Sequence, residues 1–178
     1  MTNGSTRDRI LDALEQLLLA TGSAQVTLDA VAAEAGVSKG GLLYHFPSKD
    51  ALLLGLVSRL GERADKQLDD AVSAGSSITE FYLQSPDAAA EADLQVYRSL
   101  LAALHSVDGQ NHALRDAVIA VLRGWDEHLQ NEIEDPVLAE IVRLAGDGIY
   151  FGAMLGMPPP DPELHRRVVE RLAQSGDR

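Results

Sequence analysis

Residues 28–45 read LDAVAAEAGVSKGGLLYH, and this stretch decides how the N-terminal part of the chain folds. Its apolar residues fall at helical spacing on both sides of a glycine, so we expect two short helices joined by a tight turn. Ala32 is small where the two helices would cross, and Gly36 permits the turn. Val31, Val37 and Leu42 supply apolar contacts that fix the crossing angle. The stretch therefore predicts a helix-turn-helix.

Helical periodicity continues along the rest of the chain, and alternating apolar runs joined by hairpin turns are missing. We therefore expect an all-α fold, with an N-terminal three-helix helix-turn-helix headpiece over residues 1–50 and a larger helical bundle domain over residues 51–178. Cap residues, glycines and prolines predict the helix ends. We expect helices at about 6–21, 28–35, 39–45, 49–74, 78–84, 86–104, 114–133, 136–155 and 162–174.

The formal net charge of −12 at first argues against a nucleic-acid partner, because phosphate attracts Lys and Arg. The acidity lies mainly in the C-terminal part: residues 1–50 carry 4 basic and 6 acidic side chains, and residues 51–178 carry 11 and 21. The chain has no cysteine, and its first residues, MTNGSTRDR, lack the apolar core of a signal peptide. No apolar run approaches the roughly 20 residues needed to span a membrane. We expect a cytoplasmic protein with no disulfide, metal, cofactor or membrane partner.

Residues 37–53, VSKGGLLYHFPSKDALL, resemble the recognition helix, the linker and the start of the fourth helix of the TetR family of repressors. The segment follows an amphipathic first helix near the N-terminus, as in that family, and clear resemblance covers about residues 7–60. Two positions depart from the family pattern. Gly41 replaces a side chain that is often larger, and Leu43 stands where an aromatic residue is common. The resemblance implies a second helix that enters the major groove of DNA.

The resemblance assigns four residues to the sugar-phosphate backbone of DNA. Thr27 at the start of the second helix and Lys49 at the start of the fourth would contact phosphate. Tyr44 and His45 would touch the backbone near the end of the recognition helix. Each type of residue also has a purely structural interpretation: Thr27 is a helix cap in any case, a tyrosine can belong to the core, and a lysine can be solvated.

A second group of residues would approach the base edges. It consists of Ser38, Lys39 and Gly40 at the start of the recognition helix, and Leu43 could pack on a thymine methyl group. Ser38 also serves as a helix cap. Gly40 and Gly41 each cost about 1 kcal/mol in a helix interior, and close approach to DNA would offset that cost.

In the TetR family the region after the headpiece binds an effector and dimerises through its last two long helices, and this sequence is compatible with that plan. Bulky or polar residues on otherwise apolar helix faces are candidates for a ligand pocket, although most such residues belong to ordinary cores. Asp147 lies between glycines in an apolar run, where its carboxylate can pair with a cationic effector or with Arg143. The ligand-pocket candidates are Tyr82, Tyr97, His105, Trp125, His128, Tyr150 and Met154.

The segment GDGIYFGAMLG at 146–156 contains three glycines at intervals of four residues, Gly148, Gly152 and Gly156. A continuous helix would place these three on one face. Close contact with a second helix would offset their cost of about 1 kcal/mol each. The alternatives are that they floor a ligand cavity or fray the end of the helix. An apolar stripe on the final helix supports a two-fold interface. The dimer-interface candidates are Gly148, Gly152, Gly156, Leu164, Val168 and Leu172.

These expectations converge on a DNA-binding transcriptional regulator, a repressor that binds a palindromic operator as a homodimer and is released by a small-molecule effector. An enzyme is the main alternative class, but we find no phosphate-binding glycine loop, nucleophile elbow or His, Asp and Glu set at metal spacing. We therefore expect no catalytic activity. A second alternative is a helical binding protein that has lost contact with DNA, which the acidic body would favour.

Overall fold

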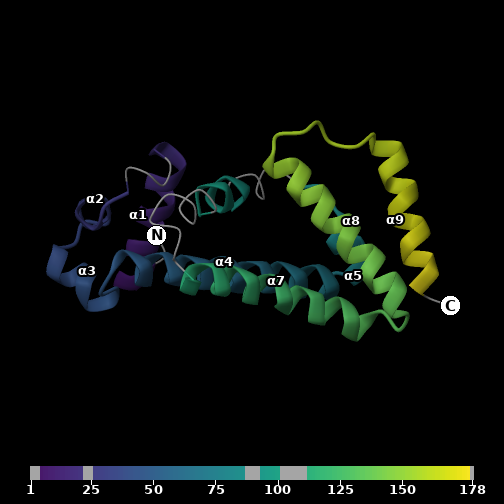
Figure 1. The fold of residues 1–178 in the computed structure, drawn as a ribbon, viewed down its shortest axis with the longest axis horizontal. Helices are drawn as coiled ribbons and strands as arrows, with labels where there is room; N and C mark the ends of the chain where they lie inside the picture. Colours follow the sequence, from purple (N-terminus) through teal and green to yellow (C-terminus); the bar gives the residue numbers. More distant parts are fainter. Residues whose placement is uncertain (1–4, 22–25, 87–92, 101–111, 177–178) are drawn as a thin grey trace. The chain divides into compact units, whose positions relative to one another are not determined.

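The computed structural model describes residues 5–21, 26–86, 93–100 and 112–176, and all regular secondary structure within these ranges is helical. This confirms the expected all-α fold. The helix expected at about 86–104 is described over 93–100. The interval expected before the helix at 114–133 lies outside the described residues up to residue 111, and the helix begins at His112. Figure 1 labels the helices α1 (Thr6–Thr21), α2 (Leu28–Glu34), α3 (Lys39–His45), α4 (Lys49–Ser73), α5 (Ile78–Leu83), α7 (His112–Glu132), α8 (Pro136–Met154) and α9 (Pro162–Gly176).

The chain divides into two compact units. The first contains Met1–Leu60 and Ala92–Ile119, and the second contains Gly61–Glu91 and Ala120–Arg178. Helices α4 and α7 therefore contribute residues to both units. The expected boundary at residue 50 separates the headpiece from the larger helical domain by function. It stays a prediction, because compact units are defined by contacts and not by function.

Helices α1, α2 and α3 form the expected three-helix headpiece within the first unit (Figure 1). Ile10, Leu11 and Leu14 on one face of α1 are fully buried. Of the three residues expected to fix the helix crossing, Val31 and Leu42 are fully buried as well, whereas Val37 is half-buried. The apolar pattern of the sequence therefore places the predicted residues in the core of the headpiece.

The turn between α2 and α3 uses Gly36 as expected. Its φ of 64° lies in the left-handed region, where a side chain would be strained. The Gly36 N–H donates to the Ala33 carbonyl at 3.1 Å, and the Val37 N–H donates to the Ala32 carbonyl at 3.0 Å. These two bonds satisfy the last carbonyl groups of α2 and end the helix in a Schellman motif.

An ion-pair cluster joins α4 to α1 inside the first unit. The Arg59 guanidinium lies 2.6 Å from the Asp12 carboxylate and 2.5 Å from the Glu15 carboxylate, and it donates to the Asp8 carbonyl at 3.3 Å. The side chains of Arg59 and Glu15 are only 15% and 17% exposed. Because these partners are 44 or more residues apart in the sequence, helical periodicity gave no sign of them.

Reciprocal side-chain caps fix two helix starts. Asp8 accepts hydrogen bonds from the Ser5 N–H at 3.0 Å and the Ser5 hydroxyl at 2.8 Å, which hold the pKa of Asp8 below its usual value. This confirms the cap expected at the start of α1. At α5, Glu80 accepts from the Ser77 N–H at 2.8 Å, and Ser77 accepts from the Glu80 N–H at 3.2 Å. The motif Ser-x-x-Glu predicts this capping box, which our sequence analysis did not identify.

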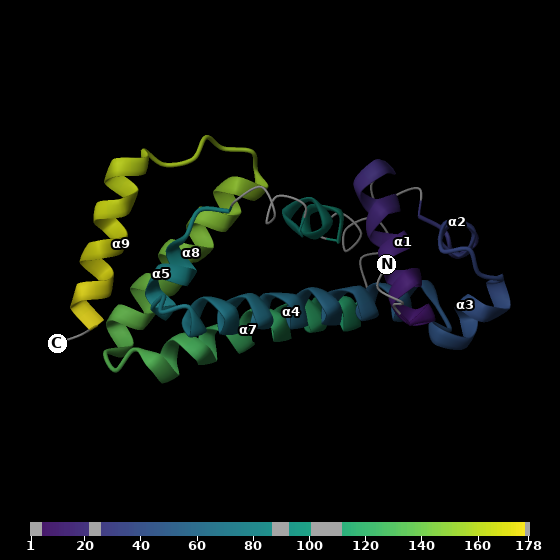
Figure 2. The same ribbon diagram turned by 180° about the vertical axis from the view of Figure 1, so that it is seen from behind.

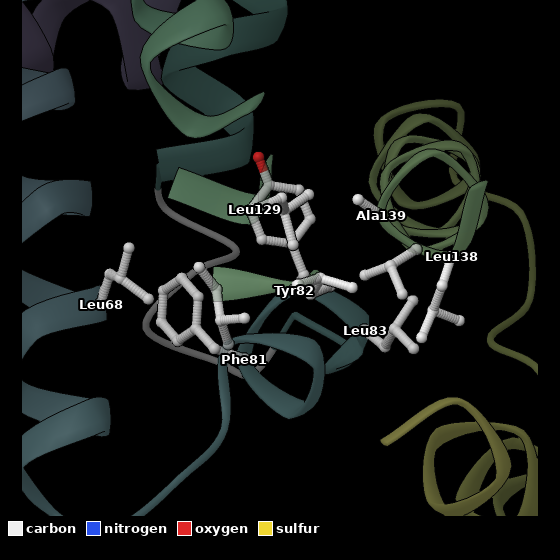
Figure 3. Close-up of a cluster of buried hydrophobic side chains, with 10 residues drawn as sticks. Leu68, Phe81, Tyr82, Leu83, Leu129, Leu138 and Ala139 are labelled. Atoms are coloured by element: carbon white, nitrogen blue, oxygen red, sulfur yellow. The ribbon is translucent and has the colours of Figure 1, made fainter. Parts of the chain in front are cut away.

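The core of the second unit forms around the short helix α5. Figure 3 shows Phe81 of α5 facing Leu68 of α4, whereas Leu83 faces Leu138 of α8. Helices α8 and α9 both contact α5, and Figure 2 shows α5 beside α8. The buried cluster consists of Leu68, Ile78, Phe81, Tyr82, Leu83, Leu129, Ile133, Leu138, Ala139 and Val142.

Gly146 is the glycine that close packing requires in this core. It is buried on α8, and a Cβ there would lie 2.8 Å from the Tyr82 carbonyl oxygen of α5. Gly148 and Gly152, which we singled out from the sequence, would meet either nothing or ordinary contacts. Gly146 lies four residues beyond the buried Val142, on the same face of α8. This spacing could have identified Gly146 as the glycine that faces the core.

Candidate nucleic-acid interface and ligand-binding region

Helix α3 presents one face to solvent and the other to the headpiece core. Lys39, Gly40, Leu43 and Tyr44 are exposed, whereas Leu42 is fully buried. Tyr44 is 85% exposed, and its ring makes an edge contact with the half-buried ring of His45 at 5.2 Å between centroids. An aromatic side chain this exposed contributes little to the fold, so a surface role is the better explanation of its presence.

The two predicted cap residues both act as caps. The Thr27 hydroxyl accepts from the Ala30 N–H at 3.1 Å, and the Ser38 hydroxyl accepts from the Gly41 N–H at 3.1 Å. A Cβ at Gly41 would lie 3.3 Å from the Ser38 hydroxyl oxygen, so the cap itself favours a small residue there. A Cβ at Gly40 would meet no other described residue within 4 Å, so packing against these residues gives no reason for a glycine at that position.

Lys39 and Lys49, the two lysines assigned to DNA, have partners inside the chain. The Lys39 ammonium lies 3.0 Å from the Asp29 carboxylate, and both side chains are more than half exposed. Such a pair contributes little to stability and can be exchanged for another anion. The Lys49 ammonium donates to the Val26 carbonyl at 2.7 Å in a partly buried position. This bond brings the start of α4 to the residue before Thr27, and no sequence pattern predicts it.

The ligand-pocket candidates are distributed over both units. Tyr97 is half-buried in the first unit, whereas Tyr82, His128, Tyr150 and Met154 belong to the second. Tyr82 lies in the buried cluster, Tyr150 and Met154 are half-buried on α8, and His128 is exposed on α7 beside a pocket. His105 and the side chain of Trp125 lie outside the described residues.

An acidic and basic cluster on α7 and α8 surrounds Tyr82. The Arg143 guanidinium pairs with Glu140 at 2.6 Å and with Asp147 at 2.7 Å. Arg143 was one of the two partners expected for the Asp147 carboxylate, and the structure shows this ion pair. Binding of a cationic effector by Asp147 remains a proposal. Burial raises the pKa of Tyr82, and the nearby carboxylates of Asp126 and Asp147 raise it further. The pKa of Asp126 is also raised, mainly by burial.

Helix α8 exposes a row of large apolar side chains. Val137, Ile141, Leu144, Phe151 and Leu155 are exposed at alternating intervals of three and four residues, apart from one gap. Gly148 occupies that gap, so it lies in the middle of the row. This is the spacing of a helix face that packs on another helix, and our sequence analysis identified only the glycine in it.

Two dimer-interface candidates differ from their expected positions. Gly156 does not share a helix face with Gly152, because α8 ends at Met154 and Gly156 follows it with a φ of 70°. The residue ends the helix as Gly36 does. On α9, Leu164 and Val168 are exposed as a dimer contact requires, but Leu172 packs against the buried cluster of its own chain.

Across the described ranges, no helix is long and apolar enough to cross a membrane. Nor does this part of the chain place three or more His, Asp or Glu side chains where they could hold a metal ion.

Comparison with known proteins gives matches at both ends of the chain. The family of bacterial regulatory proteins called the tetR family matches residues 10–56. The regulator EthR of Mycolicibacterium smegmatis is 38% identical over 73 residues, which cover 40% of this chain and 34% of that protein. The chain matches only about a third to two fifths of the length of such curated relatives.

Solved structures match over nearly the whole chain. A transcriptional regulator from Streptomyces coelicolor A3(2) aligns with a TM-score of 0.74 at 22% identity, covering 95% of this chain and 98% of that one. The multidrug binding protein EbrR, complexed with malachite green, aligns with a TM-score of 0.70 at 26% identity, covering 95% and 98%. The tetracyclin repressor-like C-terminal domain matches residues 76–175, more than half of the 178 residues, so the chain belongs to the TetR family of transcriptional regulators.

Proposed function

We propose that this chain is a DNA-binding repressor that binds a palindromic operator as a homodimer and releases it when a small-molecule effector binds. The observation that carries the proposal is the exposed face of α3. Tyr44 is 85% exposed on this face, which also contains Lys39, Gly40 and Leu43. A helix whose inner face is fixed in the headpiece core and whose outer face carries these groups is suited to the major groove.

The proposed DNA contacts divide into positioning and base-reading groups. Ser38, Lys39 and Gly40 at the start of α3 approach the base edges, and Leu43 packs on a thymine methyl group. Tyr44 and His45 touch the sugar-phosphate backbone. Thr27 and Lys49 bind phosphate from adjoining positions, because the Lys49 ammonium bonds to the carbonyl that precedes Thr27. Lys39 exchanges its exposed Asp29 partner for DNA.

We also propose that the chain dimerises through α8 and α9. The exposed row on α8 and the exposed Leu164 and Val168 on α9 supply the apolar surface, with Gly148 and Gly152 allowing close approach of the partner helix. A two-fold interface presents two recognition helices to two half-sites about one helical turn apart, or a small multiple of it. The operator is therefore palindromic in this proposal.

The effector site belongs to the larger helical part, residues 51–178, and the DNA site to residues 1–50. Similarity to a multidrug binding protein that was solved with malachite green supports a small-molecule ligand. Tyr82, Tyr150, Met154 and His128 are the described candidates within one compact unit, whereas Tyr97 belongs to the other. A ligand releases DNA only if it binds the DNA-free and DNA-bound states of the protein with different affinities. The effect is reciprocal: operator DNA lowers the affinity for the effector by the same factor as the effector lowers the affinity for the operator.

The test is binding to a labelled DNA fragment taken from upstream of the gene, measured by fluorescence anisotropy at several salt concentrations. Lys39→Ala should lower affinity, reduce the salt slope by about one unit and relax specificity. Lys66→Ala is the matched control, because Lys66 also pairs with an exposed carboxylate, Asp70, but lies on α4 in the second unit. Equal salt slopes for both variants and the parent would contradict the proposed interface.

A helical binding protein without DNA contact is the alternative. It predicts no salt-dependent preference for the upstream fragment over a scrambled sequence of equal length and composition. Tyr44→Ala separates the two possibilities further. An 85% exposed side chain should be removable without loss of thermal stability, whereas affinity for the fragment should fall if α3 reads DNA. Unchanged affinity together with unchanged stability would favour the alternative.

A further inference from the structure

A pocket of about 540 Å³ opens in the second unit, at the turn that joins α4 to α5. The end of α4, the start of α5, the end of α7 and Ala173 near the end of α9 surround it. Its floor is buried and largely apolar, because Leu68, Ile78 and Ile133 come from the core cluster of this unit. The floor is therefore suited to the apolar body of a ligand.

The rim of the pocket is acidic. Asp69 of α4 and Glu132 of α7 are exposed there, with His128 one helical turn before Glu132. Among the described residues that line the pocket, none is a lysine or an arginine. Neither carboxylate has an ion pair or hydrogen bond with another described residue, in contrast to Asp70, whose carboxylate pairs with Lys66 at 2.5 Å. Two unpaired carboxylates from separate helices favour a cation at the mouth of the pocket.

The floor also contains a threonine side chain with a hydroxyl group. Thr79 lines the pocket and is only 5% exposed, yet its hydroxyl forms no hydrogen bond with another described residue. A ligand that carries a hydrogen-bond donor would supply the partner that Thr79 lacks among these residues.

We propose that this pocket binds an organic ammonium ion, with the charged nitrogen near Asp69 and Glu132 and an apolar body over Leu68, Ile78 and Ile133. A primary ammonium satisfies the observations together. It carries the positive charge that the rim attracts, it donates hydrogen bonds to carboxylate and hydroxyl oxygens, and its hydrocarbon part covers the apolar floor. This proposal concerns binding alone and holds whether or not the ligand changes DNA binding, although it shares His128 with the proposed effector region.

The test is calorimetric titration of the full chain with three ligands that share an indole ring. Tryptamine carries an ammonium group, tryptophol a neutral hydroxyl and indole-3-propionate a carboxylate on a short chain. The proposal predicts that tryptamine binds at least tenfold more tightly than indole-3-propionate, with tryptophol between them. Equal binding of tryptamine and indole-3-propionate would overturn it.

Matched variants show whether the pocket or the overall negative charge is responsible. The double variant Asp69→Asn with Glu132→Gln removes both rim carboxylates, and we expect about tenfold weaker tryptamine binding, at two- to fivefold for each exposed group. The control is Asp70→Asn with Glu127→Gln, which makes the same charge change on the same two helices at exposed positions outside the pocket. The control double should retain tryptamine binding.

Thr79→Val tests the floor, because valine keeps the shape of threonine and removes the hydroxyl. Tryptamine binding should weaken in this variant while the melting temperature stays at or above that of the parent. Equal weakening by the pocket double and the control double would overturn the proposal in favour of long-range attraction to an acidic chain. Unchanged binding in both the pocket double and Thr79→Val would overturn it as well.

Discussion

Replacing Gly146 with alanine probes the packing of α8 on α5. The added Cβ would lie 2.8 Å from the Tyr82 carbonyl oxygen and 3.0 Å from Cδ1 of the same residue. Because the first of these atoms is backbone, rotation of a side chain cannot relieve the contact and the two helices have to move apart. Overpacking of this kind costs about 1–3 kcal/mol, whereas alanine in place of a helical glycine gains roughly 1 kcal/mol. We therefore expect destabilisation of about 0–2 kcal/mol.

Gly124→Ala on α7 is the matched control. A Cβ at Gly124 meets nothing within 4 Å, so this variant should show only the helix-propensity gain of roughly 1 kcal/mol. That gain is common to both variants, so their difference in stability isolates the steric cost of about 1–3 kcal/mol. At about 2–4 °C per kcal/mol for a chain of this size, the melting temperatures should differ by several degrees. Urea unfolding and thermal melting followed by circular dichroism measure both quantities. A Gly146→Ala protein as stable as Gly124→Ala would refute the close approach of α8 to the α5 backbone.

Three further outcomes test other parts of the structure. Arg59→Met should lower the free energy of unfolding by about 1–3 kcal/mol, because it removes the guanidinium group that pairs with the largely buried Glu15 carboxylate. Lys66→Met, in an exposed pair, should cost less than about 0.5 kcal/mol, and equal losses in urea unfolding would contradict the difference in burial. If the exposed row on α8 is a dimer interface, Leu144→Glu should give a monomer in light scattering. Leu122→Glu on α7, at an about equally exposed position, should leave the dimer intact. A dimeric Leu144→Glu protein would exclude this interface. The Ser5 hydrogen bonds lower the pKa of Asp8, so the ionised Asp8 carboxylate stabilises the folded chain above the usual carboxyl pKa. This stabilisation is lost as pH falls through the pKa of Asp8 in the folded chain, so the melting temperatures of the parent and Asp8→Asn should differ at pH 7 and converge below about pH 4. A difference that does not depend on pH would refute this role of the cap.

The helix pattern was predictable wherever local signals mark helix ends. The starts of α1, α2 and α3 follow from Ser5, Thr27 and Ser38, whose side chains accept the hydrogen bonds expected of caps. Gly36 ends α2 for an equally local reason. The family resemblance added the headpiece architecture, because it placed the recognition helix in relation to the elements before and after it.

Residues whose partners are distant in the sequence were not predictable in this way. Lys49 looked like a free phosphate ligand, and only the folded chain brings the Val26 carbonyl to it. Spacing by four residues placed Gly156 on a helix face, but spacing alone does not show whether the helix continues. A glycine followed closely by prolines is also the signal for a helix end, and that signal decided the structure. The packing of Leu172 on its own core was not predictable, because an apolar stripe does not reveal whether its own chain or a second copy covers it.

The division of α4 between the two compact units has a consequence for building chimaeric regulators. A headpiece exchanged at residue 50 would leave behind the buried Leu52, Leu56 and Leu60, which belong to the first unit. It would also leave behind Arg59, the partner of Asp12 and Glu15. A crossover at Gly61 keeps these contacts, although it still separates Ala92–Ile119 from the rest of the first unit. We therefore expect better folded hybrids from a crossover at Gly61 than from one at the linker.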